Sequence, residues 1–189
     1  MQTRRAVLML VPAAALAACS DPTANLQPLP ESQGSTGYRL GPEDEVRVTV
    51  FNDPRLTGDF KITDSGMLSL PLVGSVRAAG RSTPEVEREV ERIMAQRNLF
   101  RDPSVAIQVT KYRPVFVLGQ VERGGSYPYQ PGMTVLSAVA VAGGFNYRAL
   151  RDYVSVTRVS EDGRAQEFRA ARQSVLQPGD VVTVFERRF

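Results

Sequence analysis

Residues 40–50 read LGPEDEVRVTV, and this stretch predicts where a folded unit begins. Gly41 to Asp44 forms a turn, because glycine, proline and aspartate favour tight bends of the backbone. Val46, Val48 and Val50 then alternate with polar residues, which is the period of a strand with one buried face. The stretch therefore predicts a turn followed by a half-buried β-strand.

A second stretch repeats this arrangement near the other end of the chain. Residues 176–184 read LQPGDVVTV, again a turn with proline and aspartate before a run of valines. We interpret the likeness as shared turn chemistry, in which Asp44 and Asp180 cap nearby backbone amides. The two aspartates are not interpreted as an acid/base pair.

The first unit is expected to span residues 38–112 and to mix strands with one helix. Asp64-Ser65-Gly66 predicts a tight hairpin between strands at 60–63 and 67–70, and a short strand follows at 75–79. Thr83 is expected to cap a helix that has Pro84 in its first turn. The apolar stripe of this helix and the alternating residues of the next strand are Val86, Val90, Ile93 and Met94, then Val105, Ile107 and Val109.

The second unit is expected to span residues 113–189. Residues 115–118 form a continuous apolar run, which predicts a strand buried on both faces. Thr134 caps a predicted helix over 135–142, and Gly143-Gly144 ends it. Strands are expected at 153–159, 166–169 and 181–185. This order predicts a small mixed sheet with a helix across one face, and a β-grasp is one arrangement with this order. The fold class of the whole chain is α+β.

The N-terminus has the pattern of an export signal. Arg4 and Arg5 precede thirteen uncharged residues, which are too few to span a bilayer but match a signal peptide over 1–18. Leu16-Ala17-Ala18-Cys19 resembles the bacterial lipobox, which implies lipid on Cys19, cleavage before it and acylation of the new N-terminus. The alternative is an ordinary secretory signal with an accidental cysteine. By analogy with lipoprotein sorting, Ser20 after the cysteine implies the outer membrane.

The residues that follow Cys19 are expected to form a flexible tether. Residues 19–37 contain three prolines and two glycines and show no periodicity. Fully extended, such a segment reaches about 60 Å. We therefore expect the folded part to sit off the membrane surface.

Composition excludes several function classes. The chain has one cysteine and no histidine, which leaves almost nothing for zinc or copper and excludes Ser-His and Cys-His nucleophile pairs. We expect no cofactor, no metal and no enzyme activity. Without Arg4 and Arg5 the counts are 21 basic and 20 acidic residues, a net charge of +1, so no nucleic-acid partner is implied. A carboxylate-only glycosidase or lyase using Glu85, Glu87, Glu89 and Glu91 is a weaker hypothesis than a solvated helix face paired with Arg88 and Arg92.

Several motifs, taken in order, resemble the outer-membrane polysaccharide export family. The first unit resembles the export domain of that family through residues 38–44, 64–74, 102–105 and Tyr112. The second unit resembles its soluble-ligand-binding β-grasp domain, called SLBB, through residues 117–121, 142–145 and 176–182. Two turn residues depart from the family pattern: Glu43 stands where glycine is usual, and Gly124 where proline is usual.

The resemblance implies a lipoprotein of a capsule or exopolysaccharide export machine on the periplasmic face of the outer membrane. It implies a homo-oligomeric ring through which polysaccharide passes, and an inner-membrane polysaccharide copolymerase as partner. Because the sequence stops at Phe189, directly after the last predicted strand, we expect a short member that depends on a separate outer-membrane β-barrel.

A second hypothesis is a monomeric lipoprotein that binds a soluble ligand such as a saccharide through the β-grasp domain. Aromatic side chains could stack on a sugar ring, or they could pack at strand edges and interfaces, where tyrosine is common. The candidate residues are Tyr112, Tyr127, Tyr129, Phe145 and Tyr147.

Overall fold

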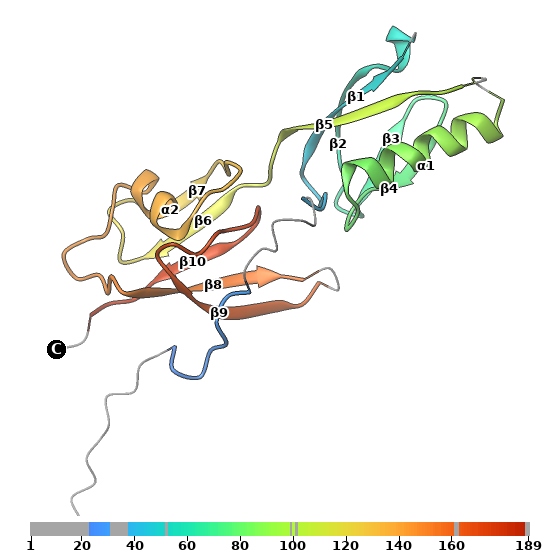
Figure 1. The fold of residues 1–189 in the computed structure, drawn as a ribbon. Helices are drawn as coiled ribbons and strands as arrows, with labels where there is room; N and C mark the ends of the chain where they lie inside the picture. Colours follow the sequence, from blue (N-terminus) through green and yellow to red (C-terminus); the bar gives the residue numbers. More distant parts are fainter. Residues whose placement is uncertain are drawn as a thin grey trace, which may run out of the picture.

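The computed structural model describes residues 23–30, 38–51, 53–98, 100, 102–160 and 163–187. The expected signal peptide and Cys19 lie outside these residues. Within them the chain forms two units, each with its own hydrophobic core (Figure 1). One core is built from residues between Tyr38 and Val109, and the other mainly from residues between Val115 and Val184.

The first unit is built on a three-stranded antiparallel sheet in the order β2-β1-β5. The strands are β1 (Glu45–Val50), β2 (Gly58–Lys61) and β5 (Val105–Lys111), and a 3-10 turn, η1 (Pro54–Leu56), joins the first two. The three alternating valines of β1 are at most 3% exposed. The predicted half-buried strand is therefore confirmed.

The predicted hairpin around Asp64-Ser65-Gly66 is wrong in its pairing. The turn forms, since the Thr63 amide donates to the Met67 carbonyl at 3.0 Å. However, β2 pairs with β1, whereas β3 (Met67–Leu70) pairs with β4 (Gly74–Arg77). The backbone hydrogen bonds of the four-residue strand β2 go to β1, and the short loop after β3 brings β4 back beside it.

The helix α1 (Thr83–Gln96) packs along β5 through its buried Val86, Val90 and Met94. Ser82, not Thr83, is its N-cap. The Glu85 Oε2 atom accepts a hydrogen bond from the Ser82 amide at 2.7 Å, because this glutamate lies three residues after the cap, as in a capping box. No helix in the described part of the chain is both long enough and apolar enough to cross a membrane.

The second unit is a β-grasp with strand order β7-β6-β10-β8-β9. In chain order the elements are β6 (Val115–Gly119), β7 (Gly125–Tyr127), α2 (Val135–Val141), β8 (Tyr153–Val159), β9 (Ala165–Ala171) and β10 (Val181–Val184). The first and last strands of the unit, β6 and β10, are parallel neighbours at the centre of the sheet, and the other pairs are antiparallel. Thr134 caps α2 as predicted.

The strand β6 is buried on one face only, which corrects the expectation for residues 115–118. Val115 and Val117 are fully buried, whereas Phe116 and Leu118 are 39% and 47% exposed. The buried pair belongs to the core that also contains the buried residues of α2. The apolar run is therefore continuous in sequence although only alternate residues face that core.

Residues 27–29 lie against the free edge of β9 and do not form a free tether. The Leu29 amide donates to the Arg169 carbonyl, and the Arg169 amide donates to the Gln27 carbonyl, both at 2.8 Å. Leu29 is 8% exposed and belongs to the core of the second unit. Burial of this leucine and the otherwise unpaired groups of an edge strand account for the docking. The expected flexibility of residues 19–37 thus fails for this segment.

Candidate functional site

Asp44 lies at the junction of the two units and is fully buried. Its Oδ2 atom accepts hydrogen bonds from the Gly41 amide at 2.8 Å and from the Tyr38 hydroxyl at 2.5 Å. Its Oδ1 atom accepts from the Arg113 amide at 3.1 Å, and the Arg113 Nε atom lies 3.6 Å away. The turn of the first unit is thereby tied to the segment that leads into the second.

Asp180 occupies the equivalent turn of the second unit. Its Oδ2 atom accepts from the Gln177 amide at 2.7 Å, three residues earlier, as Asp44 does from Gly41. Arg158 donates two further hydrogen bonds to Asp180, at 2.9 and 2.7 Å. The interpretation of both aspartates as caps of local amides is confirmed, and each has its own arginine.

Burial shifts the pKa values of Tyr38 and Asp44 at the junction. Burial raises the pKa of the Tyr38 phenol, and the hydrogen bond to Asp44 raises it further. Burial also raises the pKa of the Asp44 carboxyl, while the hydrogen bonds from Tyr38 and Gly41 and the charge of Arg113 oppose this shift. This cluster joins the two units.

Two of the candidate aromatic residues also belong to this junction. The Tyr112 ring contacts Tyr38 edge-on at 4.9 Å between centroids and Tyr129 at 5.5 Å. The Tyr129 hydroxyl donates to the Leu176 carbonyl at 3.3 Å. Tyr112 and Tyr129 therefore pack between units instead of forming an open platform for a sugar.

The other three aromatic residues do not join them. Tyr127 donates its hydroxyl to the Arg123 carbonyl and packs, like Phe145, against the core of the second unit. Tyr147 is 79% exposed, with the Arg148 guanidinium 5.8 Å from its ring centre. The candidate residues thus have separate roles, and these five do not make one binding site.

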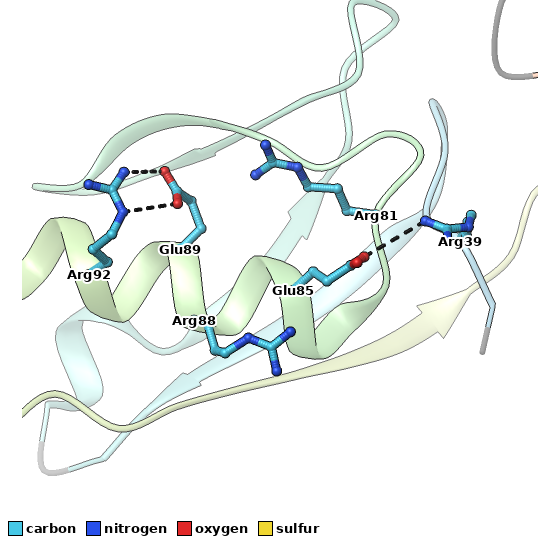
Figure 2. Close-up of a pocket in the computed structure, with 6 residues that line it drawn as sticks. All are labelled: Arg39, Arg81, Glu85, Arg88, Glu89 and Arg92. Atoms are coloured by element: carbon cyan, nitrogen blue, oxygen red, sulfur yellow. Dashed lines mark hydrogen bonds and ion pairs between the residues drawn. The ribbon is translucent and has the colours of Figure 1, made fainter. Parts of the chain in front are cut away.

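A pocket lined by charged side chains lies on the first unit, at the exposed face of α1 (Figure 2). Its volume is about 420 Å³. Arg39 comes from the segment before β1, and Arg81 from the loop between β4 and α1. The remaining residues lie on α1 at helical spacing, which places them on one face: Glu85, Arg88, Glu89 and Arg92.

Two ion pairs form the ends of this pocket, which we call the arginine pocket. Figure 2 shows the Glu89–Arg92 pair at one end and the Glu85–Arg39 pair at the other, with Arg81 between them. The first pair is close, with Arg92 donating at 2.5 and 3.1 Å, while the second is long at 3.8 Å.

The arginine pocket carries an excess of positive charge. Four arginines and two glutamates give a net charge of +2. Hydrogen bonds from Ser82 lower the pKa of the Glu85 carboxyl, and the hydrogen bond from Arg92 lowers that of Glu89, so both carboxyls are ionised at neutral pH. The guanidinium groups of Arg81 and Arg88 make no ion pair or hydrogen bond with any residue that the structure describes. Such a surface can accept an anion.

The other glutamates of α1 have a different role from the one expected. Glu87 accepts from the Ile107 amide at 2.7 Å, and Glu91 accepts from the Val105 amide at 2.9 Å. They therefore cap the edge of β5 that does not face β1, and the expectation of a solvated face holds only for part of the helix. Among the described residues no group of histidine, cysteine, aspartate or glutamate is arranged to hold a metal ion.

The arginine pocket was not predicted from the sequence. The spacing of Glu85, Arg88, Glu89 and Arg92 along one helix face was visible in the sequence. The approach of Arg39 and Arg81 was not, because these residues lie 46 and 4 positions before Glu85 and reach it through the tertiary fold.

Comparison with known proteins supplies a further line of evidence. Residues 32–110 match a family model described as polysaccharide biosynthesis/export protein, and residues 114–168 match the SLBB domain. The exopolysaccharide production protein ExoF of Rhizobium meliloti (strain 1021) is 35% identical over 170 residues, covering 79% of this chain. The EPS I polysaccharide export outer membrane protein EpsA of Ralstonia solanacearum is 26% identical over 168 residues, covering 75% of it. The chain spans about 40% of the length of these relatives.

Proposed function

The chain belongs to the polysaccharide export family, with an export domain followed by an SLBB domain, and we propose that it takes part in the export of an extracellular polysaccharide. The observation that carries the proposal is the order of the two matched domains, each of which coincides with a unit that has its own core. The relatives are named for producing or exporting polysaccharide, and not for a catalysed reaction. The proposed role is accordingly docking and passage of polymer.

Deletion of the gene in its host tests this role. We expect the deletion strain to lose most of its extracellular polymer and a plasmid copy to restore it. Normal extracellular polymer in the deletion strain would reject the proposed function.

The proposed location is the periplasmic face of the outer membrane, with lipid on Cys19. The lipobox Leu16-Ala17-Ala18-Cys19 and the outer-membrane relative support it. Cys19 lies only four positions before the buried Thr23, so the chain can separate these two residues by at most about 14 Å. Because residues 27–29 are docked on β9, the edge of this strand would then lie near the membrane. A long flexible tether would not separate the two. The substitution Cys19→Ser should release a folded protein into the periplasm and impair export.

The proposed assembly is a homo-oligomeric ring that works with an inner-membrane copolymerase and an outer-membrane β-barrel. Family membership supports this proposal, since export through a ring is what the resemblance implies. Size-exclusion chromatography with light scattering, on the protein in detergent and on the Cys19→Ser variant, measures the assembly. A monomer in both samples at high concentration would contradict the ring.

A further inference from the structure

The arginine pocket carries positive charge that its own carboxylates do not fully neutralise. Two other arginines of the first unit are engaged: Arg47 donates to Asp59 at 2.8 and 2.6 Å, and Arg97 donates to the Leu72 carbonyl at 2.9 Å. Arg81 and Arg88 have no such partner among the described residues, although glutamates lie nearby. Their guanidinium groups are available to a ligand.

The rim of the pocket is held in place by contacts within the protein. Arg39 donates to the Gly80 carbonyl at 2.6 Å, which fixes the segment before β1 against the loop after β4. Arg92 is held by Glu89 and by the Gln96 side chain, to which it donates at 2.9 Å. Because these contacts order the rim in advance, a ligand would mainly have to order Arg81 and Arg88.

The chemistry of the lining indicates an anionic ligand, and a carboxylate is an anion that sugar units of a polysaccharide can carry. The planar guanidinium group of arginine matches a carboxylate through two parallel hydrogen bonds. A volume of about 420 Å³ lies within the range of small-molecule sites, so one or two sugar units fit. The pocket is formed by exposed or half-buried side chains, so affinity should be modest. Weak binding suits transport, where a substrate must enter a site and leave it again.

We propose that the arginine pocket binds carboxylate-bearing sugar units of the exported polysaccharide. This inference rests on the proposed function, because it names the substrate class that the export domain contacts. It assigns Arg81 and Arg88 as the residues that bind the acidic sugar, and Arg39 and Arg92 as the residues that shape the pocket.

Binding of a uronic acid oligomer tests the proposal directly. The probe is tri-galacturonate, and the neutral control ligand is its fully methyl-esterified form, titrated into the full-chain protein in detergent by isothermal calorimetry. The charge-removing variant is Arg81→Gln combined with Arg88→Gln. A matched control is Arg123→Gln combined with Arg172→Gln, which removes two exposed arginines from the second unit.

We expect the wild-type protein and the matched control to bind tri-galacturonate alike and the methyl ester at least about tenfold more weakly. The pocket variant should lose about tenfold in affinity with an unchanged melting temperature, since neither substitution removes an ion pair or hydrogen bond between described residues. Equal binding of acid and ester, or equal loss in both variants, would overturn the proposal.

Two further arms separate other anions from sugar carboxylates. Inorganic phosphate and vesicles with phosphatidylglycerol are offered to the same proteins. The proposal is overturned if the Arg81 and Arg88 substitutions weaken vesicle or phosphate binding while tri-galacturonate does not bind the wild-type protein. It is also overturned if the host polymer contains no acidic sugar. Neither result would touch the export role, which is tested separately in the deletion strain.

Discussion

At the scale of single residues, Glu43 is held in a conformation that favours glycine. Its φ is +73°, in the left-handed region, and it stands at the turn position where the resemblance implied glycine. Its carboxylate forms an exposed ion pair with Lys61 at 2.7 Å. An exposed pair contributes little, whereas a left-handed residue with a side chain costs about 1–2 kcal/mol.

Comparing Glu43→Gly with Glu43→Ala therefore isolates this strain, because both substitutions remove the pair with Lys61. We expect the glycine variant to be more stable than the alanine variant by about 1 kcal/mol, measured by urea unfolding. Equal midpoints for the two variants would mean that the backbone at this turn is not strained.

In contrast to the exposed Glu43 carboxylate, the Asp44 carboxylate is buried, and both of its oxygens accept hydrogen bonds. Asp44→Ala leaves Arg113 and the Gly41 amide without their acceptor, and we expect a loss of about 3–5 kcal/mol in the free energy of unfolding. Asp59→Ala is the matched control, because Asp59 pairs with Arg47 at the exposed surface, so its loss should destabilise the fold far less than the loss of Asp44. Similar losses for the two variants would show that the junction contact does not stabilise the fold.

At the scale of elements, α1 protects the outer edge of β5. Glu87 and Glu91 accept the Ile107 and Val105 amides, which would otherwise form part of an exposed strand edge open to pairing with another chain. We expect the double substitution of both glutamates by alanine to lower the free energy of unfolding by about 1–2 kcal/mol per lost bond. It should also speed hydrogen exchange of these two amides and promote aggregation.

Two kinds of control variant test whether the effect comes from the lost hydrogen bonds to the Val105 and Ile107 amides. Glutamine at both positions retains an acceptor and should restore most of the exchange protection. Glu89→Ala, on the same helix but paired with Arg92, should leave exchange at Val105 and Ile107 unchanged. Protected amides in the double alanine variant would contradict the assigned contacts.

Individual helices and strands were easier to predict from the sequence than the pairing of the strands. Periodicity predicted β1, α1 and β5, because alternate apolar residues or a helical stripe report a buried face directly, whereas α2 was predicted from its Thr134 cap and the glycines that end it. Pairing was harder: β2 pairs with β1 instead of β3, because local turn signals do not say which strand supplies the next hydrogen bonds. The docking of residues 27–29 on β9 also escaped prediction, since a proline-rich segment has no period of its own.

At the scale of the whole molecule, the two units are joined by specific contacts. The Tyr38, Tyr112 and Tyr129 rings pack in sequence across the junction, and the Arg113 amide donates to the Asp44 Oδ1 atom at 3.1 Å. The sequence indicated the aromatic residues but not that they would divide between a junction, a core and an exposed loop. The arginine pocket likewise needed the fold, because three separate segments contribute to it.

The measurement that tests the central claim most directly is the ratio of extracellular to cell-retained polymer in the deletion strain, by pulse labelling of newly made polysaccharide. If the protein acts in export, the ratio should fall at least about tenfold relative to the complemented strain, while polymer or its intermediates accumulate within the cell. If extracellular and retained polymer fall together at a constant ratio, the protein acts in synthesis, and the export account is contradicted.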